Sequence, residues 1–230
     1  MERIKLAIER ARQQAAMTHG GAVPAPKVTP LRTPAVQPVD MSAVDLLPLD
    51  ETLLERNRIV TMQQDNPLRQ PFDLLRTQVL QKMQDHGWRT VAVTSPSMQS
   101  GKTVVAINLA MSIAHHPSKS ALLVDFDLRR PQVASYLGLP HGNSLNDVFA
   151  GKMEVHGAMV HAGVPGFFVL PTHGRVAGAS ELLASERTTR MIRGLGDEHP
   201  ERIVVFDLPA GTAPGDVVSG PPGIRGAHEW

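Results

Sequence analysis

The chain has 230 residues, of which 42% are hydrophobic and 4% aromatic, and its formal net charge is +1. This length accommodates one α/β domain with a tail, and a charge this close to zero argues against nucleic acid as a partner. The lack of cysteine excludes disulfides and thiolate metal sites. The lack of a signal peptide or of an apolar run near ~18 residues predicts a cytoplasmic protein.

Two segments are expected ahead of the main domain. Residues 1–18 place Ile4, Ile8 and Ala11 at helical spacing, which predicts an amphipathic helix. A helix this short is only marginally stable alone, so we expect it to dock on a partner. A peripheral position at the inner face of the cell membrane is the alternative. Residues 19–44 hold five prolines, a composition typical of an extended linker.

The main domain is predicted over residues 45–218 and begins with a helical lead-in. Asp50 is placed to cap a helix over residues 51–57, and apolar residues recur at helical spacing over residues 71–84. Residues 219–230 show neither helical nor strand periodicity. We interpret them as an irregular tail and the domain as truncated at its C-terminus.

Residues 90–103 are the most informative stretch, because an apolar β-branched run ends there in a loop that closes with Ser-Gly-Lys-Thr. A helical apolar pattern follows, which is the context of a phosphate-binding P-loop, although Pro96 stands where the general pattern has its first glycine. Gly101 would let a phosphate approach the backbone N–H groups at the helix N-terminus. Lys102 would reach the β- and γ-phosphates, and the Thr103 hydroxyl would ligate Mg²⁺. The residues predicted to bind nucleotide are Ser97, Met98, Gln99, Ser100, Gly101, Lys102, Thr103 and Val104.

Two further apolar segments end in carboxylates. One strand pattern ends at Asp125 and Asp127, with Pro131 expected to begin the next helix, and another ends at Asp207. Continuous Val, Ile and Leu runs are typical of parallel sheets, in which ligands bind beyond the carboxyl ends of the strands. We therefore expect the three aspartates to meet Lys102 at one edge of a sheet. Each aspartate taken alone is also explained as a turn or cap residue.

The segments Ser-Gly-Lys-Thr, Val-Asp-Phe-Asp-Leu-Arg-Arg-Pro and Val-Phe-Asp-Leu-Pro together resemble the Walker A, A′ and B motifs of bacterial tyrosine kinases of the CpsD/CapB type, within the wider MinD/ParA P-loop class. The resemblance covers residues 50–210. It implies an α/β P-loop NTPase fold, a mostly parallel sheet flanked by helices, with ATP and Mg²⁺ as cofactors. It also implies a protein-tyrosine kinase or kinase-like ATPase that serves capsular or exopolysaccharide biosynthesis and export.

The resemblance gives each charged residue a role. Lys102 would stabilise the transferring phosphate, and Asp125 would orient or deprotonate the attacking nucleophile. Asp127 is the second catalytic candidate, through the metal or as a base. The implied Mg²⁺ ligands are Thr103, Asp127 and Asp207, of which Asp207 would act through water. The pKa of Asp125 is expected to stay low if Mg²⁺ lies close to it.

The implied partner is a membrane-embedded polysaccharide chain-length regulator or export protein. In this family a Glu-x-x-Arg-x-x-Arg pattern joins subunits; here Gln70 and Asp73 occupy its first two positions and Arg76 its last, which leaves homo-oligomer formation open. The one tyrosine, Tyr136, is expected to be a packing residue. Two alternatives therefore stand beside the kinase: a nucleotide-switched regulatory ATPase of MinD/ParA style without kinase activity, and a truncated inactive relative.

Overall fold

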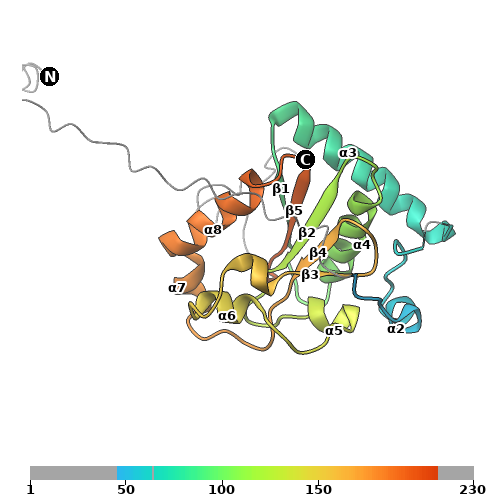
Figure 1. The fold of residues 1–230 in the computed structure, drawn as a ribbon. Coiled ribbons are helices and arrows are strands. Elements are labelled where there is room, and N and C mark those ends of the chain that lie inside the picture. Colours follow the sequence, from blue (N-terminus) through green and yellow to red (C-terminus); the bar gives the residue numbers. More distant parts are fainter. Residues whose placement is uncertain (1–45, 64, 212–230) are drawn as a thin grey trace, which may run out of the picture. The chain divides into compact units, whose positions relative to one another are not determined.

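The computed structural model describes residues 46–63 and 65–211 (Figure 1). The predicted N-terminal helix and linker and the predicted irregular tail lie outside these ranges. Within them, no helix combines the length and the hydropathy that crossing a membrane requires.

One five-stranded sheet forms the centre of the described domain, with helices on both of its faces (Figure 1). The strands lie in the order β1-β5-β2-β4-β3; the first four are parallel, and β3 pairs antiparallel with β4 at the edge. This confirms the predicted fold class. The strands are β1 (Thr90–Val93), β2 (Ser120–Asp125), β3 (Val160–His161), β4 (Phe167–Leu170) and β5 (Arg202–Asp207). The helices are α2 (Glu51–Arg56), η2 (Pro67–Arg69), α3 (Gln70–His86), α4 (Lys102–Ala114), α5 (Val133–Leu137), α6 (Leu145–Phe149), η3 (Val155–Ala158), α7 (Ala179–Leu183) and α8 (Glu186–Asp197).

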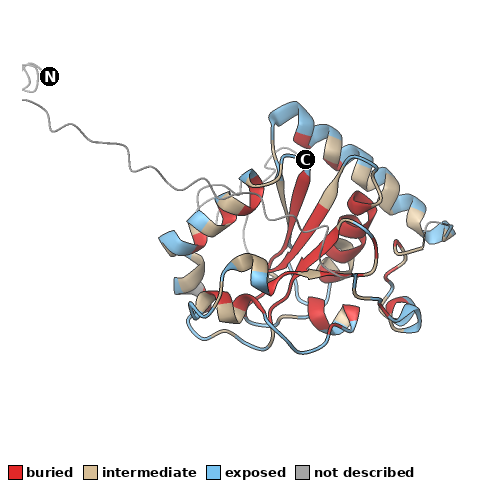
Figure 2. Cartoon of the chain, in the orientation of Figure 1, coloured by how far each residue is buried: buried red, intermediate tan, exposed pale blue. Residues whose placement is uncertain are grey.

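Alternate residues of the central strands pack on opposite faces of the sheet, because successive side chains of a strand point in opposite directions. Leu123 and Val205 belong to the apolar cluster that includes residues of α3 and α4. Leu122 and Val204 belong to the cluster that includes residues of α6 and α8. Figure 2 shows the central strands and much of α4 as buried. Burial on both faces explains why these strands are continuous apolar runs in the sequence.

The chain enters the domain along the sheet edge formed by β3. Leu47 forms a parallel bridge with Ala162. Its N–H donates to the carbonyl of His161 at 2.8 Å, and its own carbonyl accepts from the N–H of Gly163 at 2.9 Å. The start of the described chain is thereby joined to the sheet.

Both helices of the lead-in form where the sequence predicts them, with slightly different ends. Asp50 caps α2 as expected, because its carboxylate accepts from the backbone N–H groups of Thr52 at 2.9 Å and Leu53 at 3.2 Å. Helix α3 starts one residue earlier and ends two residues later than predicted. It ends at Gly87, whose φ of 67° suits the left-handed C-cap that glycine adopts without steric cost.

A buried asparagine on α4 connects the lead-in to the P-loop helix. The Asn108 Oδ1 atom accepts from the backbone N–H groups of Val60 at 2.8 Å and Thr61 at 3.1 Å. Its Nδ2 atom donates to the carbonyls of Arg58 and Val104, both at 2.9 Å. Asn108 is 0% exposed. Because an unpaired buried amide is costly, this network favours one position of the lead-in against α4.

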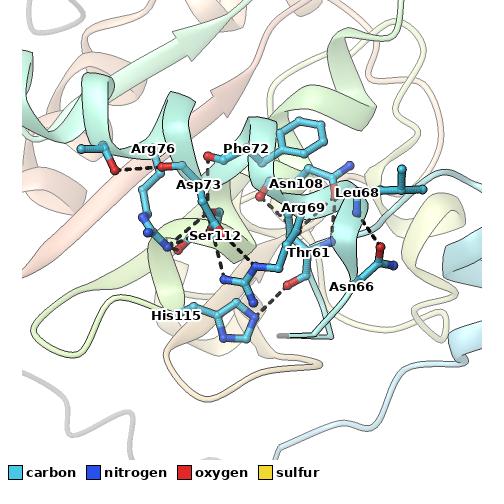
Figure 3. Close-up of polar contacts among 11 residues, drawn as sticks. Thr61, Asn66, Leu68, Arg69, Phe72, Asp73, Arg76, Asn108, Ser112 and His115 are labelled. Carbon is cyan, nitrogen blue, oxygen red and sulfur yellow. Dashed lines mark hydrogen bonds and ion pairs between the residues drawn. The ribbon is translucent and has the colours of Figure 1, made fainter.

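A second polar cluster joins α3 to α4 (Figure 3). The Asp73 carboxylate accepts from the Arg69 guanidinium at 2.8 and 3.1 Å, from Arg76 at 3.1 Å and from the Ser112 hydroxyl at 2.8 Å. The hydrogen bond from Arg69, together with those of Ser112 and the two positive charges, lowers the pKa of Asp73 against an opposing effect of burial. Asp73 and Arg76, two positions of the subunit-joining pattern, are therefore engaged within this chain.

Replacing Asn108 by alanine is expected to lower the free energy of unfolding by roughly 2–4 kcal/mol, because buried backbone groups on two segments lose their partner. Urea denaturation followed by circular dichroism measures this. Asn143→Ala is the matched control, since Asn143 is exposed and donates from its side chain to the Gly157 carbonyl at 3.1 Å. Its effect should stay below about 1 kcal/mol. Equal losses in the two variants would contradict the proposed connection.

Asp73 should make stability depend on pH in the acid range. Its pKa is lowered by folding, so its contribution is present above the unfolded pKa of about 3.9 and is lost as the pH falls through the folded pKa. Asp73→Asn should therefore reduce stability at neutral pH, and its difference from the wild type should shrink below about pH 4. Urea denaturation over this pH range measures the difference, with the exposed Asp85→Asn as control. A difference that is independent of pH would rule out the charged hydrogen bond as its cause.

Candidate functional site

The P-loop lies between the end of β1 and the start of α4. Lys102 is the first residue of α4, and Gly101 before it has a φ of 86°. Gln99 also has a positive φ, 58°, which side-chain-bearing residues adopt at a steric cost. Backbone strain of this kind is typical of ligand-binding loops.

The other residues of the predicted nucleotide loop fall into two groups. Residues 97–100 are exposed, and the hydroxyls of Ser95 and Ser100 both donate to the Ser97 carbonyl, at 2.7 and 3.0 Å. These hydrogen bonds fix the loop. Val104 instead packs against the apolar core. A nucleotide contact from Val104 would therefore come from its backbone.

The Lys102 ammonium lies between two carboxylates. Its Nζ is 2.9 Å from Asp127 Oδ2 and 3.3 Å from Asp207 Oδ1, and its side chain is 10% exposed. Burial alone would lower the pKa of Lys102, but the charges and hydrogen bonds of the two aspartates outweigh burial and raise it. Lys102 is therefore a permanent cation at the start of the helix.

Thr103 and Asp207 bring a hydroxyl and a carboxylate together beside Lys102. The Thr103 Oγ1 donates to Asp207 Oδ2 at 2.7 Å, and Asp207 is fully buried. Burial raises the pKa of Asp207, and the charge of Lys102 and the bond from Thr103 only partly oppose this. A cation added here would favour the ionised carboxylate.

Asp125 lies opposite Asp207 in the register of β2 and β5 and is fully buried. Its Oδ2 accepts from the N–H groups of Gln132 at 3.1 Å and Val133 at 3.0 Å, whereas its Oδ1 has no hydrogen-bond partner among the described residues. Burial, followed by the charge of Asp207, raises the pKa of Asp125 well above its usual value. The sequence analysis expected a low pKa for Asp125 only with Mg²⁺ close to it, and this raised pKa belongs to the site without Mg²⁺.

The donor set fits Mg²⁺, which prefers oxygen ligands and keeps several waters and phosphate oxygens. The unpaired, buried Oδ1 of Asp125 is the kind of atom that a bound cation or its water would satisfy. Thr103, Asp127 and Asp207 supply the predicted oxygens. In the chain as far as it is described, no three His, Cys, Asp or Glu side chains form a metal cluster of their own. Mg²⁺ would therefore be held jointly with phosphate.

Helix α5 starts later than predicted, at Val133 and not at Pro131, because the backbone of Gln132 has a φ of −134°, outside the helical region. Tyr136 on this helix packs against the core, as expected.

Sequence reasoning did not select Thr172 for the site. Its hydroxyl, on a residue 2% exposed, donates to the Asp125 carbonyl at 2.7 Å and supports the backbone where β2 ends. The available signal was its position two residues after the end of β4, which matches the position of Asp127 after the end of β2.

A parallel sheet, a Gly-Lys-Thr loop opening a helix, and aspartates from two neighbouring strand ends define a P-loop α/β domain. No family model matches the chain. Within the P-loop class, the chain is similar in sequence to bacterial tyrosine-protein kinases. It is 32% identical over 136 residues to the tyrosine-protein kinase etk of Escherichia coli K12.

Solved structures agree with this relationship. The kinase domain of Escherichia coli tyrosine kinase ETK matches with a TM-score of 0.61 and 26% identity, over 76% of this chain and 73% of that one. The BceF tyrosine kinase domain shares the fold, with a TM-score of 0.62, 24% identity, and coverage of 76% and 74%. The sequence match to etk covers 59% of this chain but 18% of etk, so the chain spans a small part of its full-length relative.

The two neighbouring aspartates should respond oppositely to the same substitution. Asp125→Asn should leave the free energy of unfolding unchanged or raise it by up to about 1 kcal/mol at neutral pH, because it removes a buried charge that Asp207 opposes. Asp127→Asn should lower it by roughly 1–3 kcal/mol, because Lys102 loses a partner. Urea denaturation of the nucleotide-free protein compares them. A larger loss in Asp125→Asn than in Asp127→Asn would contradict this view of the site.

Proposed function

We propose that this chain binds Mg²⁺-ATP at Lys102, Thr103, Asp127 and Asp207 and transfers the terminal phosphoryl group to a tyrosine, as a protein-tyrosine kinase of capsular or exopolysaccharide biosynthesis. The observation that carries the proposal is the Lys102 ammonium, held 2.9 Å from Asp127 and 3.3 Å from Asp207 at the start of the P-loop helix. The similarity to etk and to the ETK kinase domain supports the reaction type.

Each residue of the site has a separate task in this reaction. The loop backbone and Lys102 hold the phosphates, while Thr103 and Asp207 hold Mg²⁺, which neutralises phosphate charge when bound. Asp125 orients the tyrosine hydroxyl and accepts its proton. A bond forms between the tyrosine oxygen and the terminal phosphorus, and the bond from that phosphorus to the ADP oxygen breaks. Positioning and charge neutralisation supply most of the catalysis.

The phosphate acceptor that we infer is a tyrosine of another molecule. The one tyrosine of the printed sequence, Tyr136, is partly buried and packs against the core. The motif resemblance supports a membrane-embedded polysaccharide chain-length regulator or export protein as the partner, with this chain at the inner face of the membrane.

Nucleotide binding is the first test. Lys102→Met should raise the Kd for Mg²⁺-ATP by about tenfold or more, because the fixed cation is lost. Thr103→Val should remove the dependence of binding on Mg²⁺, whereas Thr103→Ser keeps the hydroxyl and should retain it. Titration calorimetry with and without Mg²⁺ measures both effects. Equal affinity of the wild type and Lys102→Met would refute the site.

Phosphate transfer is the second test. Labelled ATP is supplied with a tyrosine-containing polymer, and labelled polymer is compared with released inorganic phosphate. Transfer that Asp125→Asn abolishes supports the kinase. Phosphate release without transfer favours the nucleotide-switched ATPase, and a wild type that binds no nucleotide favours the inactive relative.

A further inference from the structure

An exposed arginine reaches from the segment after β2 to the P-loop. The Arg130 Nη1 lies 2.9 Å from the Sδ of Met98. Both side chains are exposed, Met98 by 62%. A thioether is a weak acceptor, whereas a guanidinium carries five donors and a permanent charge. The contact is therefore one that a stronger acceptor would readily replace.

The backbone of Arg130 is fixed by the same carboxylate that holds Lys102. The Arg130 N–H donates to Asp127 Oδ1 and to the Asp127 carbonyl, each at 3.0 Å. The other carboxylate oxygen of Asp127 lies 2.9 Å from Lys102 Nζ. One aspartate thus contacts both the buried ammonium of Lys102 and the backbone N–H of the exposed Arg130.

The charges of the cluster favour a second cation for a phosphate ligand. Lys102 faces Asp127 and Asp207, so carboxylates already offset its charge. A Mg²⁺-bound triphosphate keeps a net negative charge, and part of it lies on the terminal phosphate, which a diphosphate lacks. Arginine pairs with phosphate through two parallel, charge-assisted hydrogen bonds, which are about twice as strong as neutral ones.

We propose that Arg130 exchanges the Met98 sulfur for the terminal phosphate of a bound nucleoside triphosphate, and so makes this site prefer the triphosphate over the diphosphate. This inference rests on the proposed function. When the terminal phosphate leaves, the guanidinium returns to Met98. The contact between Arg130 and Met98 of the P-loop would then form with a bound diphosphate and break with a bound triphosphate.

The test titrates the full chain with a non-hydrolysable ATP analogue and with ADP, both with Mg²⁺. Arg130→Ala should raise the Kd of the ATP analogue by about tenfold or more and the Kd of ADP by less than about threefold. Arg130→Lys keeps the charge without the planar fork and should recover part of the loss. Arg190→Ala, which removes an exposed arginine of α8, should change neither Kd. Circular dichroism checks that each variant is folded.

The outcomes separate this inference from the function on which it rests. Loss of affinity for both nucleotides alike, or for neither, overturns the role of Arg130. Met98→Leu removes the sulfur; if it abolishes the triphosphate preference as Arg130→Ala does, Arg130 is a tether of the loop and the inference fails. A wild type that binds no nucleotide overturns both proposals. Binding that Lys102→Met abolishes and Arg130→Ala leaves intact overturns the inference alone.

Discussion

A lysine ammonium placed between two carboxylates is the interaction around which the edge of this sheet is arranged. Lys102, Asp127 and Asp207 come from three separate stretches of the chain, and the parallel pairing of β1, β5 and β2 brings those stretches together. Two carboxylates thus face one ammonium. Asp125 adds a third carboxylate, whose Oδ1 has no hydrogen-bond partner among the described residues. Burial and the crowding of the carboxylates raise the pKa values of Asp125 and Asp207. A bound Mg²⁺ would relieve this repulsion.

Helix α4 transmits the position of this cluster to the rest of the domain. Its first residue is Lys102, while further along it Asn108 bonds the lead-in and Ser112 bonds Asp73 on α3. Both networks are polar contacts in largely buried surroundings, where partners must match closely to be favourable. Apolar packing alone would allow α3 and the lead-in to slide along α4. The polar pairs instead favour one position of α3 and of the lead-in against α4. Because the P-loop ends at the start of α4, its position relative to these segments is fixed as well.

The fold and much of the candidate site could be predicted, because their signals are local. Apolar runs mark β1, β2 and β5, the Gly-Lys-Thr tripeptide marks the helix start, and parallel topology brings strand ends together. The start of α5 could not be predicted, because Pro131 is a good first helical residue, and the non-helical φ of −134° at Gln132 has no local signal in the sequence. The partners of Asp73 are likewise set by how α3 meets α4. Thr172 is neither charged nor part of the phosphate-binding loop, and only its place after a strand suggested a role.

The bridge at Leu47 has a consequence for how copies of this protein meet in a crowded solution. An uncovered border of a sheet offers unsatisfied amides and carbonyls to any extended peptide, which is a common start of aggregation. Here the Leu47 N–H donates to the carbonyl of His161, and the Leu47 carbonyl accepts from the N–H of Gly163, next to the short β3. The incoming polypeptide thus occupies the place where a foreign strand would add. A protein cut after this point would expose that border, and its tendency to self-associate would increase.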